Sequence, residues 1–474
     1  MRILLVEDDQ QFVGAVTQIV AELTAGPEVW IAHSKSEAEA HLQEGFFDLI
    51  VLDLKIPTEV GLLDADPQHG RTIFYSARKH SPGTPIFVLT GSSAEDFIDD
   101  FLRGSQQVDI WSVGEKTQTV QFLSKIRFLE FRSRIEGICR SVWNLSEIEL
   151  AFHDSLQIIT PFDRLLRIFS KKYGGTRCDV RLVGGGLSNA QVYRLRLTSS
   201  DGSTILNAIG KLGRIADIQS EGERFDSFVN RLDPSATPRK LCVLEFGAKN
   251  NAGVFYSLAA DYTLDGFSVA ASHPTIAREI PTKLQQMFRP WWEGVPETRY
   301  SVRDIRKTHL SDDSFNDLLK KFPIPWIQEF EARQVQVHWC PTHGDLHGKN
   351  VLVAEAGQCV LIDYGDVSMG TASSDPITYE LSLLFHPDGP LRGSGWPTIE
   401  QAAHWGDLDI YTQGCPFADV IRETRAWTMA VGAGKREISA SAYSYLFRQY
   451  KYSDTDKMLI GALLEAIHNL FLST

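Results

Sequence analysis

The N-terminal 130 residues alternate short apolar runs with amphipathic stretches, and this pattern restricts the possible folds more than any other feature of the chain. The apolar runs cover Ile3–Val6, Glu28–Ala32, Asp48–Leu52, Pro85–Leu89 and Val108–Val113. Helical patterns separate them, and apolar runs bounded in this way are typical of strands buried on both faces. The pattern therefore predicts a five-stranded parallel sheet with helices on both of its faces.

Polar residues follow four of these runs. Asp8 and Asp9 come after the first, Asp53 after the third, Thr90 after the fourth and Lys116 after the fifth. In a doubly wound sheet the carboxyl ends of the strands share one edge, so these side chains should meet there. Three carboxylates at one place need a cation, and Mg²⁺ with its oxygen ligands is suitable. Asp53 would then accept a phosphoryl group as a carboxylate nucleophile, with Lys116 and Thr90 contacting the new oxygens.

Together these motifs resemble the response-regulator receiver family, which has a flavodoxin-like α/β fold. The matching segments are LLVEDD at 4–9, VLDLKIP at 51–57, FVLTG at 87–91, and Lys116. The resemblance implies that Asp8, Asp9 and Asp53 bind Mg²⁺ and that a sensor histidine kinase phosphorylates Asp53. It also implies that Thr90 and Lys116 sense the phosphoryl group.

The segment departs from the receiver pattern in two places. The loop Thr58–His69 after Asp53 is long, and we expect it to form a lid or a contact with another domain. Thr117 stands where the family usually has proline, and Val113 stands where it often has an aromatic residue. The usual mode of signal output is therefore less well supported than the phosphorylation chemistry.

A helical pattern extends from Gln118 to Phe169, and Pro161 begins a separate helix within it. One interpretation is a last receiver helix that packs on its own sheet and is followed by a spacer. The other is a helix that transmits the signal or forms a homodimer. Periodicity alone does not separate the two interpretations.

Beyond residue 175 a glycine-rich turn is followed by a lysine in an apolar strand. The turn contains Gly184, Gly185 and Gly186, whose backbone N–H groups can approach a phosphate. Lys211 lies within the strand pattern, where it needs an anionic partner, and Glu221 has the better spacing of the two nearby acids.

The strongest C-terminal signal is HGDLHGKN at 343–350, followed by a short strand and the sequence VLIDYG at 360–365. Asp345 and Asn350 lie five residues apart on one loop, and Asp363 follows the strand. A carboxylate base facing a hydroxyl, with two oxygen ligands for Mg²⁺, is the arrangement that phosphoryl transfer requires.

This region resembles the kinase-like superfamily, in the branch of aminoglycoside phosphotransferases and choline kinases. The resemblance implies a bilobal α+β phosphotransferase that uses ATP and Mg²⁺. Asp345 would be the catalytic base, and Asn350 and Asp363 would bind Mg²⁺. Gly184–Gly186 and Lys211, paired with Glu221, would contact ATP. The fusion also resembles bacterial signalling proteins that carry a "ternary complex associated domain".

The acceptor side of the predicted phosphotransferase has no clear motif. Trp291, Trp292, Tyr300 and Trp326 could line an acceptor pocket, including a cation–π box. Aromatic residues at such spacings more often belong to the core. The acceptor substrate is therefore left open.

Composition restricts the remaining functions. The net charge of −13 argues against nucleic acid as a partner. The six cysteines are scattered without metal-ligand spacing, which predicts reduced thiols in a cytoplasmic protein. No apolar stretch reaches the roughly 18 residues needed to span a membrane.

We expect three parts: a receiver at 1–130, a helical connector at 131–175 and a kinase-like domain at 176–474. The last would divide into an N-lobe at 176–262 and a C-lobe at 263–474. The predicted function is a response regulator whose output domain is a phosphotransferase gated by the receiver. The alternative is a catalytically silent kinase-like module that binds nucleotide or protein and is switched by phosphorylation.

Overall fold

The computed structural model describes residues 1–23, 26–90, 105–153, 156–185, 190–235, 237–259 and 261–473. The chain forms two compact units. The first contains Met1–Gln219 and Lys240–Leu258, and the second contains Ser220–Arg239 and Ala259–Thr474. In the part of the chain that the structure describes, no helix is both long and apolar enough to cross a membrane.

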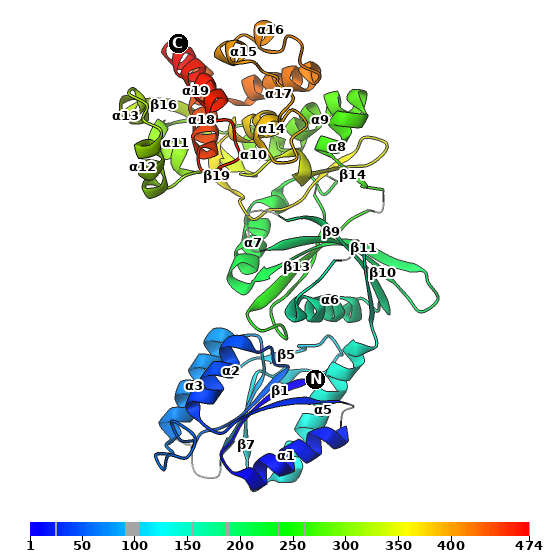
Figure 1. Cartoon of the computed structure of the whole chain (residues 1–474). Helices are drawn as coiled ribbons and strands as arrows, with labels where there is room; N and C mark the ends of the chain where they lie inside the picture. Colours follow the sequence, from blue (N-terminus) through cyan, green and yellow to red (C-terminus); the bar gives the residue numbers. More distant parts are fainter. Residues whose placement is uncertain are drawn as a thin grey trace. The chain divides into compact units, whose positions relative to one another are not determined.

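The N-terminal part of the first unit is a parallel sheet with the strand order β2-β1-β3-β4-β7 (Figure 1). Its strands are β1 (Arg2–Val6), β2 (Glu28–Ala32), β3 (Leu49–Asp53), β4 (Ile86–Thr90) and β7 (Val120–Ser124). The helices around it are α1 (Gln10–Leu23), α2 (Lys35–Glu44), α3 (Pro67–His80) and α5 (Phe128–Ser146). Alternate strand residues pack against α1 and α5 on one face and against α2 and α3 on the other. This arrangement confirms the predicted five-stranded α/β fold.

Local sequence determines where the helices around this sheet begin. The side chain of Ser34 accepts a hydrogen bond from the Glu37 amide and so caps α2, and Asp66 caps α3 just before Pro67. Gly70 lets α3 lie directly on the chain that leaves β3, because a Cβ atom there would be 2.4 Å from the Leu54 carbonyl oxygen. The backbone at Leu54, directly after Asp53, is thereby packed against α3.

The predicted fifth strand at Val108–Val113 is wrong, since the fifth strand is β7. Within the predicted range, only Val108 is in a strand, the two-residue β5 (Gln107–Val108), which pairs with β6 (Thr117–Gln118). Ile110 and Trp111 are apolar for another reason: both are buried in the core between the receiver sheet and the elements that follow it.

The second part of the first unit is a six-stranded sheet in the order β12-β13-β11-β10-β9-β8. Its strands are β8 (Glu149–Phe152), β9 (Arg177–Gly185), β10 (Gln191–Thr198), β11 (Thr204–Arg214), β12 (Lys240–Leu244) and β13 (Asn251–Ser257). Helix α6 (Thr160–Lys172) packs on this sheet, with the Phe169 ring stacked on Phe255 at a centroid distance of 4.0 Å.

The segment predicted as helical, Gln118–Phe169, contains β7, β8 and the last residue of β6 as well as α5 and most of α6. The helix start at Pro161 is confirmed, because this proline lies in the first turn of α6.

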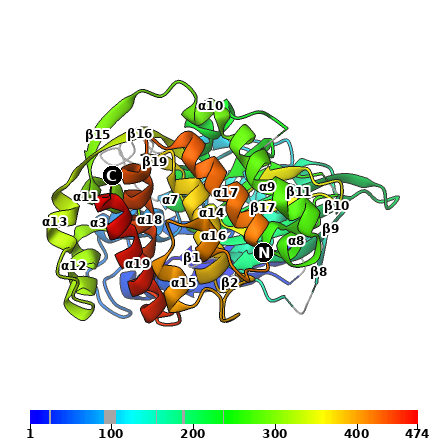
Figure 2. The same ribbon diagram turned by 90° about the horizontal axis from the view of Figure 1, so that it is seen from above.

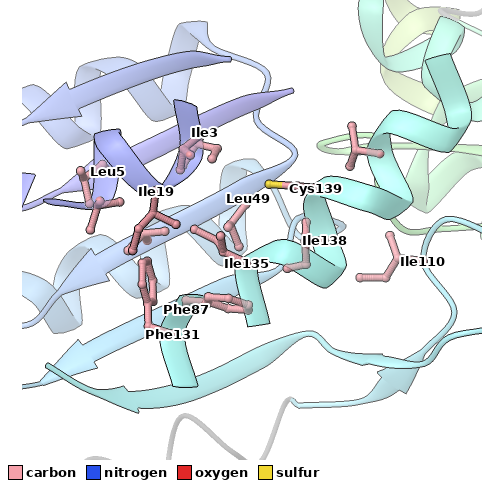
Figure 3. Packing of buried hydrophobic residues seen from close by; sticks show 14 of the residues in the cluster. Ile3, Leu5, Ile19, Leu49, Phe87, Ile110, Phe131, Ile135, Ile138 and Cys139 are labelled. Atoms are coloured by element: carbon pink, nitrogen blue, oxygen red, sulfur yellow. The ribbon is translucent and has the colours of Figure 1, made fainter. Parts of the chain in front are cut away.

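The two sheets of the first unit share one hydrophobic core. The second half of α5 contributes Ile138 and Cys139, which lie with Ile110 at the edge of the cluster in Figure 3. Ile168 of α6 belongs to the same cluster. The first half of α5 packs on the receiver sheet, as the first interpretation expected, and its second half lies in the core shared with α6. Signal transmission and homodimer formation by this helix stay predictions.

Polar contacts join the same two parts. Gly83, in the turn before β4, accepts a hydrogen bond from the Gly247 amide (2.6 Å) and donates one to the Lys249 carbonyl (3.1 Å). Arg164 of α6 forms an ion pair with Asp48 at 2.8 Å, and both side chains are largely buried. The receiver sheet and the six-stranded sheet therefore contact each other through backbone, charge and apolar packing.

The second unit is mainly helical and includes most of α7 (Ile215–Ser227). Its central helix is α14 (Ser374–Phe385), every residue of which is buried. Packed against α14 are α17 (Ala418–Val431) and α18 (Lys435–Gln449), and α18 lies beside α19 (Lys457–Leu472) (Figure 2). The other helices are η1 (Val229–Arg231), α8 (Gly266–Ser272), α9 (Pro274–Met287), α10 (Arg289–Trp292), α11 (Val302–Lys307), α12 (Asp312–Lys321), α13 (Ile327–Ala332), η2 (Gly348–Asn350), α15 (Ile399–Ala403) and α16 (Leu408–Tyr411).

Two small antiparallel sheets complete this unit, in the orders β14-β17-β18 and β15-β16-β19. Their strands are β14 (Leu264–Asp265), β15 (Glu297–Ser301), β16 (Gln334–Thr342), β17 (Val351–Val353), β18 (Cys359–Leu361) and β19 (Ser368–Thr371). The loops that leave β16 and β18 carry the residues predicted for phosphoryl transfer.

Candidate phosphoacceptor and phosphotransfer sites

Asp53 is the last residue of β3 and is almost completely buried. Its Oδ2 atom accepts a hydrogen bond from Lys125 Nζ at 2.8 Å. The same ammonium group lies 2.7 Å from Oε2 of Glu7, which is the residue immediately after β1 and is completely buried. One lysine thus joins two buried carboxylates at the carboxyl edge of the sheet.

Carboxylate oxygens of Glu7, Asp8 and Asp53 lie within 4.8 Å of one another. Three hard oxygen donors at such distances fit a Mg²⁺ ion, which would neutralise this site and an incoming phosphoryl group. Asp9, predicted as a ligand, has another role. Its Oδ1 atom accepts hydrogen bonds from the amides of Gln11 and Phe12 and caps α1. The acidic pair at the site is therefore Glu7 and Asp8 rather than Asp8 and Asp9.

Burial and mutual repulsion change the protonation of this group. Burial, reinforced by the Asp53 charge, raises the pKa of Glu7 to about 7, against the lowering effect of Lys125. Burial also raises the pKa of Asp53, although the hydrogen bond and charge of Lys125 oppose that shift. The single ammonium therefore does not fully compensate the carboxylates, which is the electrostatic condition that favours binding of a further cation.

The structure corrects the assignment of Lys116 as the lysine of the phosphoacceptor site. Lys116 precedes the short strand β6, whereas Lys125 follows the fifth strand of the sheet and contacts Asp53. The error came from placing that strand at Val108–Val113. With the strand at β7, the aromatic residue that seemed to be missing is Phe122, three positions before Lys125, while Ile126 stands where proline is usual.

Thr90 is the last residue of β4 and pairs with Ser124 in the ladder, and its side chain lies outside the described residues. The long loop after Asp53 is anchored by a bridge between Ile56 and Asp66. Its tip is exposed, and Leu63 is fully accessible to solvent. In this structure the tip of the loop is therefore a solvent-facing apolar surface.

The second candidate site lies in the second unit, on the loop between β16 and η2. The amides of His343 and Gly344 donate hydrogen bonds to the buried Asp375 carboxylate at 2.8 and 3.1 Å. Gly344 has a φ of +78°, and a Cβ atom there would lie 2.4 Å from the Asp366 carbonyl oxygen. The loop that carries Asp345 is thus held directly against the loop that carries Asp363.

Hydrogen bonds connect the three residues predicted for catalysis and metal binding. Asn350 Nδ2 donates to the Asp345 carbonyl oxygen at 2.9 Å, and the Ile362 amide donates to the Asn350 carbonyl at 3.0 Å. Asp363 follows directly and has a φ of +65°, an unusual conformation for a residue with a side chain. The structure therefore brings Asp345, Asn350 and Asp363 together on two adjoining loops.

The carboxylate of Asp345 is held in its charged form. Burial acts to raise its pKa, but a hydrogen bond from His347 and the charges of His347, Arg448 and His343 lower it well below its usual range. A carboxylate in this state can accept a hydrogen bond from a substrate hydroxyl and receive its proton.

The residues predicted for nucleotide contact are divided between the two units. Gly184 and Gly185 end β9, and Gly186 lies outside the described residues. Lys211 is buried in β11 of the first unit, and Glu221 is buried in α7 of the second.

The four aromatic residues considered for an acceptor pocket pack in separate places. The indole of Trp291 stacks on Phe288, and Trp292 donates its N–H to the Gln285 carbonyl. The Tyr300 ring stacks on Trp339, and the Trp326 ring stacks on His468. These aromatic side chains therefore pack against different partners in separate places and do not form one shared cation–π box.

Comparison with known proteins assigns families to both regions. Residues 3–107 match the response regulator receiver domain, and residues 280–391 match the phosphotransferase enzyme family. No curated protein matches the chain.

Several solved structures are similar to parts of the chain. A receiver domain protein from Methanospirillum hungatei JF-1 is 25% identical, covering 30% of this chain and 97% of that one, with a TM-score of 0.21. The receiver domain of the sensor histidine kinase PA1611 from Pseudomonas aeruginosa PAO1, solved with magnesium, is 20% identical over 29% of this chain and 97% of its own, with a TM-score of 0.20. An aminoglycoside-3'-phosphotransferase of type VIII is 18% identical over 62% of this chain and 99% of its own, with a TM-score of 0.39.

The buried carboxylates at the carboxyl edge of the parallel sheet and the joined loops around Asp345 agree with these two assignments. The chain is thus a fusion of a response regulator receiver domain with a domain of the phosphotransferase enzyme family.

Proposed function

We propose that this chain is a signalling phosphotransferase: a sensor histidine kinase phosphorylates Asp53, and this controls transfer of phosphoryl groups from ATP to a hydroxyl acceptor by the second domain. The observation that carries the proposal is the assembly of Asp345, Asn350 and Asp363 on two loops that Gly344 and Asp366 hold in contact.

In the proposed reaction, the hydroxyl oxygen of the acceptor attacks the γ-phosphorus of ATP, and Asp345 accepts the proton of that hydroxyl group. The bond from the γ-phosphorus to the bridging oxygen breaks, and ADP leaves. Asn350 and Asp363 offer the oxygen atoms that would hold Mg²⁺, which neutralises charge on the nucleotide phosphates. Lys211 of β11 is a further proposed phosphate contact, which rests on the resemblance to kinase-like proteins alone.

Control by the receiver is supported by the contacts inside the first unit. Strand β3 ends at Asp53, and Asp48, just before its first residue, pairs with Arg164 of α6. Helix α6 packs on the six-stranded sheet through the stacked rings of Phe169 and Phe255. Phe255 faces Gly210 of the neighbouring strand β11, next to Lys211. A continuous line of packed residues therefore leads from the phosphoacceptor to the strand of the nucleotide lysine.

Nucleotide binding is the first test. Mg-ATP should raise the melting temperature of the full chain and should have no effect on Asp363→Ala. Glu355→Ala, which removes an exposed carboxylate from the turn between β17 and β18, is the matched control and should respond like the wild type. If Mg-ATP stabilises none of the three proteins, the enzyme proposal fails.

Coupling is the second test, and it separates the proposal from the alternative of a silent module. The rate of ADP formation should differ between protein treated with acetyl phosphate and untreated protein, and the difference should vanish in Asp53→Asn. Nucleotide binding without Asp345-dependent turnover, even after phosphorylation, would favour a phosphorylation-switched binding module.

A further inference from the structure

A polar pocket of about 360 Å³ lies in the first unit, where the hairpin of β5 and β6 meets helix α5. Gln107 and Gln118, which pair across the hairpin, line one side of it. The hairpin is attached to the chain that enters β7. The Thr119 amide donates to the Gln106 carbonyl at 2.9 Å, and the Gln106 amide donates to Thr119 Oγ1 at 3.0 Å. This side of the pocket is therefore fixed by backbone contacts.

Helix α5 forms another side of the pocket. Arg134, Ile138 and Ser141 line it, and their spacing of three or four residues places them on one face of the helix. Gly137 lines it too, in the middle of the helix, where glycine is less favourable than alanine. A Cβ atom at Gly137 would have open space around it. Packing does not require a glycine here, and its effect is to leave room in the pocket.

Gln121 of β7 lines the pocket with a buried amide. This residue is only 8% exposed, and it lies on the same face of the sheet as Leu123, which belongs to the hydrophobic core under α5. Among the residues that the structure describes, its side-chain amide has no hydrogen-bond partner. A buried amide without a partner is costly. Gln121 therefore has a donor and an acceptor available to a molecule in the pocket.

The charged residues that line the pocket are two cations, Lys116 and Arg134, and one acid, Glu115. Arg134 lies 3.8 Å from Glu130 in an exposed pair on the surface of α5. Lys116 forms no ion pair with any residue in the described part of the chain. The pocket thus has a local excess of positive charge in a chain with a net charge of −13, and this excess favours an anion.

We propose that this pocket binds a small polyol that carries a phosphate or a carboxylate group. The anionic group would lie between Lys116 and Arg134, which enter the pocket from the hairpin and from α5. The hydroxyl groups would exchange hydrogen bonds with Gln121 and with the amides of Gln107 and Gln118, since amides both donate and accept. The volume of the pocket is near the lower end of the range for small-molecule sites, roughly 300–1,000 Å³.

Thermal melts of the full chain test the pocket without any turnover. Glucose 6-phosphate and gluconate distinguish a phosphate from a carboxylate, and glucose and inorganic phosphate each supply one part of the ligand alone. At equal ionic strength, without ATP or Mg²⁺, at least one anionic polyol should raise the melting temperature in a saturable way. The increase should exceed those with glucose and with inorganic phosphate. Absence of a saturable increase with both anionic polyols would overturn the inference, as would an equal increase with inorganic phosphate.

Variants of the pocket show whether the increase arises there. Gln121→Leu removes the amide at nearly equal size, and Arg134→Met removes one cation. Each should raise the apparent Kd, taken from the dependence of melting temperature on ligand concentration, about tenfold or more. Arg140→Met is the matched control, because Arg140 is an exposed arginine of α5 that pairs with Glu136 at 3.2 Å and does not line the pocket. It should bind like the wild type. An unchanged Kd in both pocket variants would contradict the inference.

A pair of helical glycines provides a steric test. Gly137→Leu should fill part of the pocket and abolish the ligand-dependent increase in melting temperature. Gly14→Leu is its control, since Gly14 lies in α1, away from the pocket residues, and also has open space around an added Cβ atom. Both variants should melt above the wild type without ligand, because leucine is a better helix former than glycine. If Gly137→Leu keeps the full ligand-dependent increase, the ligand binds elsewhere and the inference fails.

Discussion

Asp48 and Arg164 form a buried ion pair at 2.8 Å, and it joins the chain just before β3 to helix α6. Asp48 Oδ2 also accepts a hydrogen bond from the Arg2 amide at 2.8 Å, so the carboxylate is held from both sides. Because β3 ends at Asp53, the ion pair and the phosphoacceptor occupy opposite ends of one five-residue strand. This strand therefore connects the phosphorylation site with helix α6, which packs on the six-stranded sheet.

Loss of the Asp48–Arg164 pair should destabilise the first unit. We expect Arg164→Met to lower the free energy of unfolding by about 2–4 kcal/mol, because it leaves the Asp48 carboxylate buried without its cation. The measurement is urea denaturation of the full chain. Arg132→Met is the control, since Arg132 pairs with Glu22 at 2.9 Å on the surface of the same unit and should cost less than about 1 kcal/mol. Equal losses in the two variants would contradict a special role for the buried pair.

Glu7 should make the stability of the metal-free protein depend on pH. In the folded protein its pKa is raised from 4.5 to about 7, so between these values the folded state holds a proton that the unfolded chain has released. Stability should therefore fall as the pH rises from about 4.5 to 7, by an amount on the order of 1–3 kcal/mol. Chemical denaturation of wild type and Glu7→Gln in EDTA would show it, with a flatter profile for the variant. Added Mg²⁺ should stabilise the wild type more at pH 8 than at pH 6.

Lys125 rather than Lys116 should be required for the response to phosphorylation. Lys125 contacts Asp53 and Glu7 directly, whereas Lys116 lies before β6. After treatment with acetyl phosphate, Lys125→Met should lose the change in ADP formation, and Lys116→Met should keep it. Phosphate incorporation at Asp53 should be followed in parallel by intact mass measurement. A loss of response in Lys116→Met alone would restore the sequence-based assignment.

Gly344→Ala should disrupt the phosphotransfer site. Its φ of +78° strains any residue with a side chain, and the added Cβ would lie 2.4 Å from the Asp366 carbonyl oxygen. The two loops would have to separate to relieve this contact, and their separation would move Asp345 relative to Asp363. We therefore expect ADP formation to fall at least about tenfold. Gly414→Ala is the matched control, with a φ of +71° and open space around the added atom. If both variants lose turnover equally, backbone strain alone and not the contact with Asp366 is responsible.

Sequence alone was sufficient for those parts of the fold that periodicity determines locally. The first four strands of the receiver sheet, the loop of Asp345 and Asn350, and the helix start at Pro161 all follow from short patterns. The fifth strand could not be found in this way, because Ile110 and Trp111 are as apolar as strand residues but are buried in a core shared between domains. Lys116 was misassigned for the same reason.

The residues of the candidate sites, too, could be predicted only in part from the sequence. The positions of Asp53 and Asp363 follow from motifs, but the participation of Glu7 depends on which acid follows β1 directly and which one caps α1. The contact of Lys125 with Glu7 joins residues that are 118 positions apart in the chain. Such tertiary proximity has no local signature in a single sequence.

The shared core of the first unit restricts how its receiver domain can be exchanged by gene recombination. Receiver domains can be exchanged between output domains when the boundary is an exposed linker. Here α5 crosses the expected boundary at residue 130, and its second half, together with Ile168, completes the core on the far side. A recombination event at that position would expose apolar surface on both fragments. The receiver and the six-stranded sheet should therefore be transmitted and lost together, as one evolutionary module.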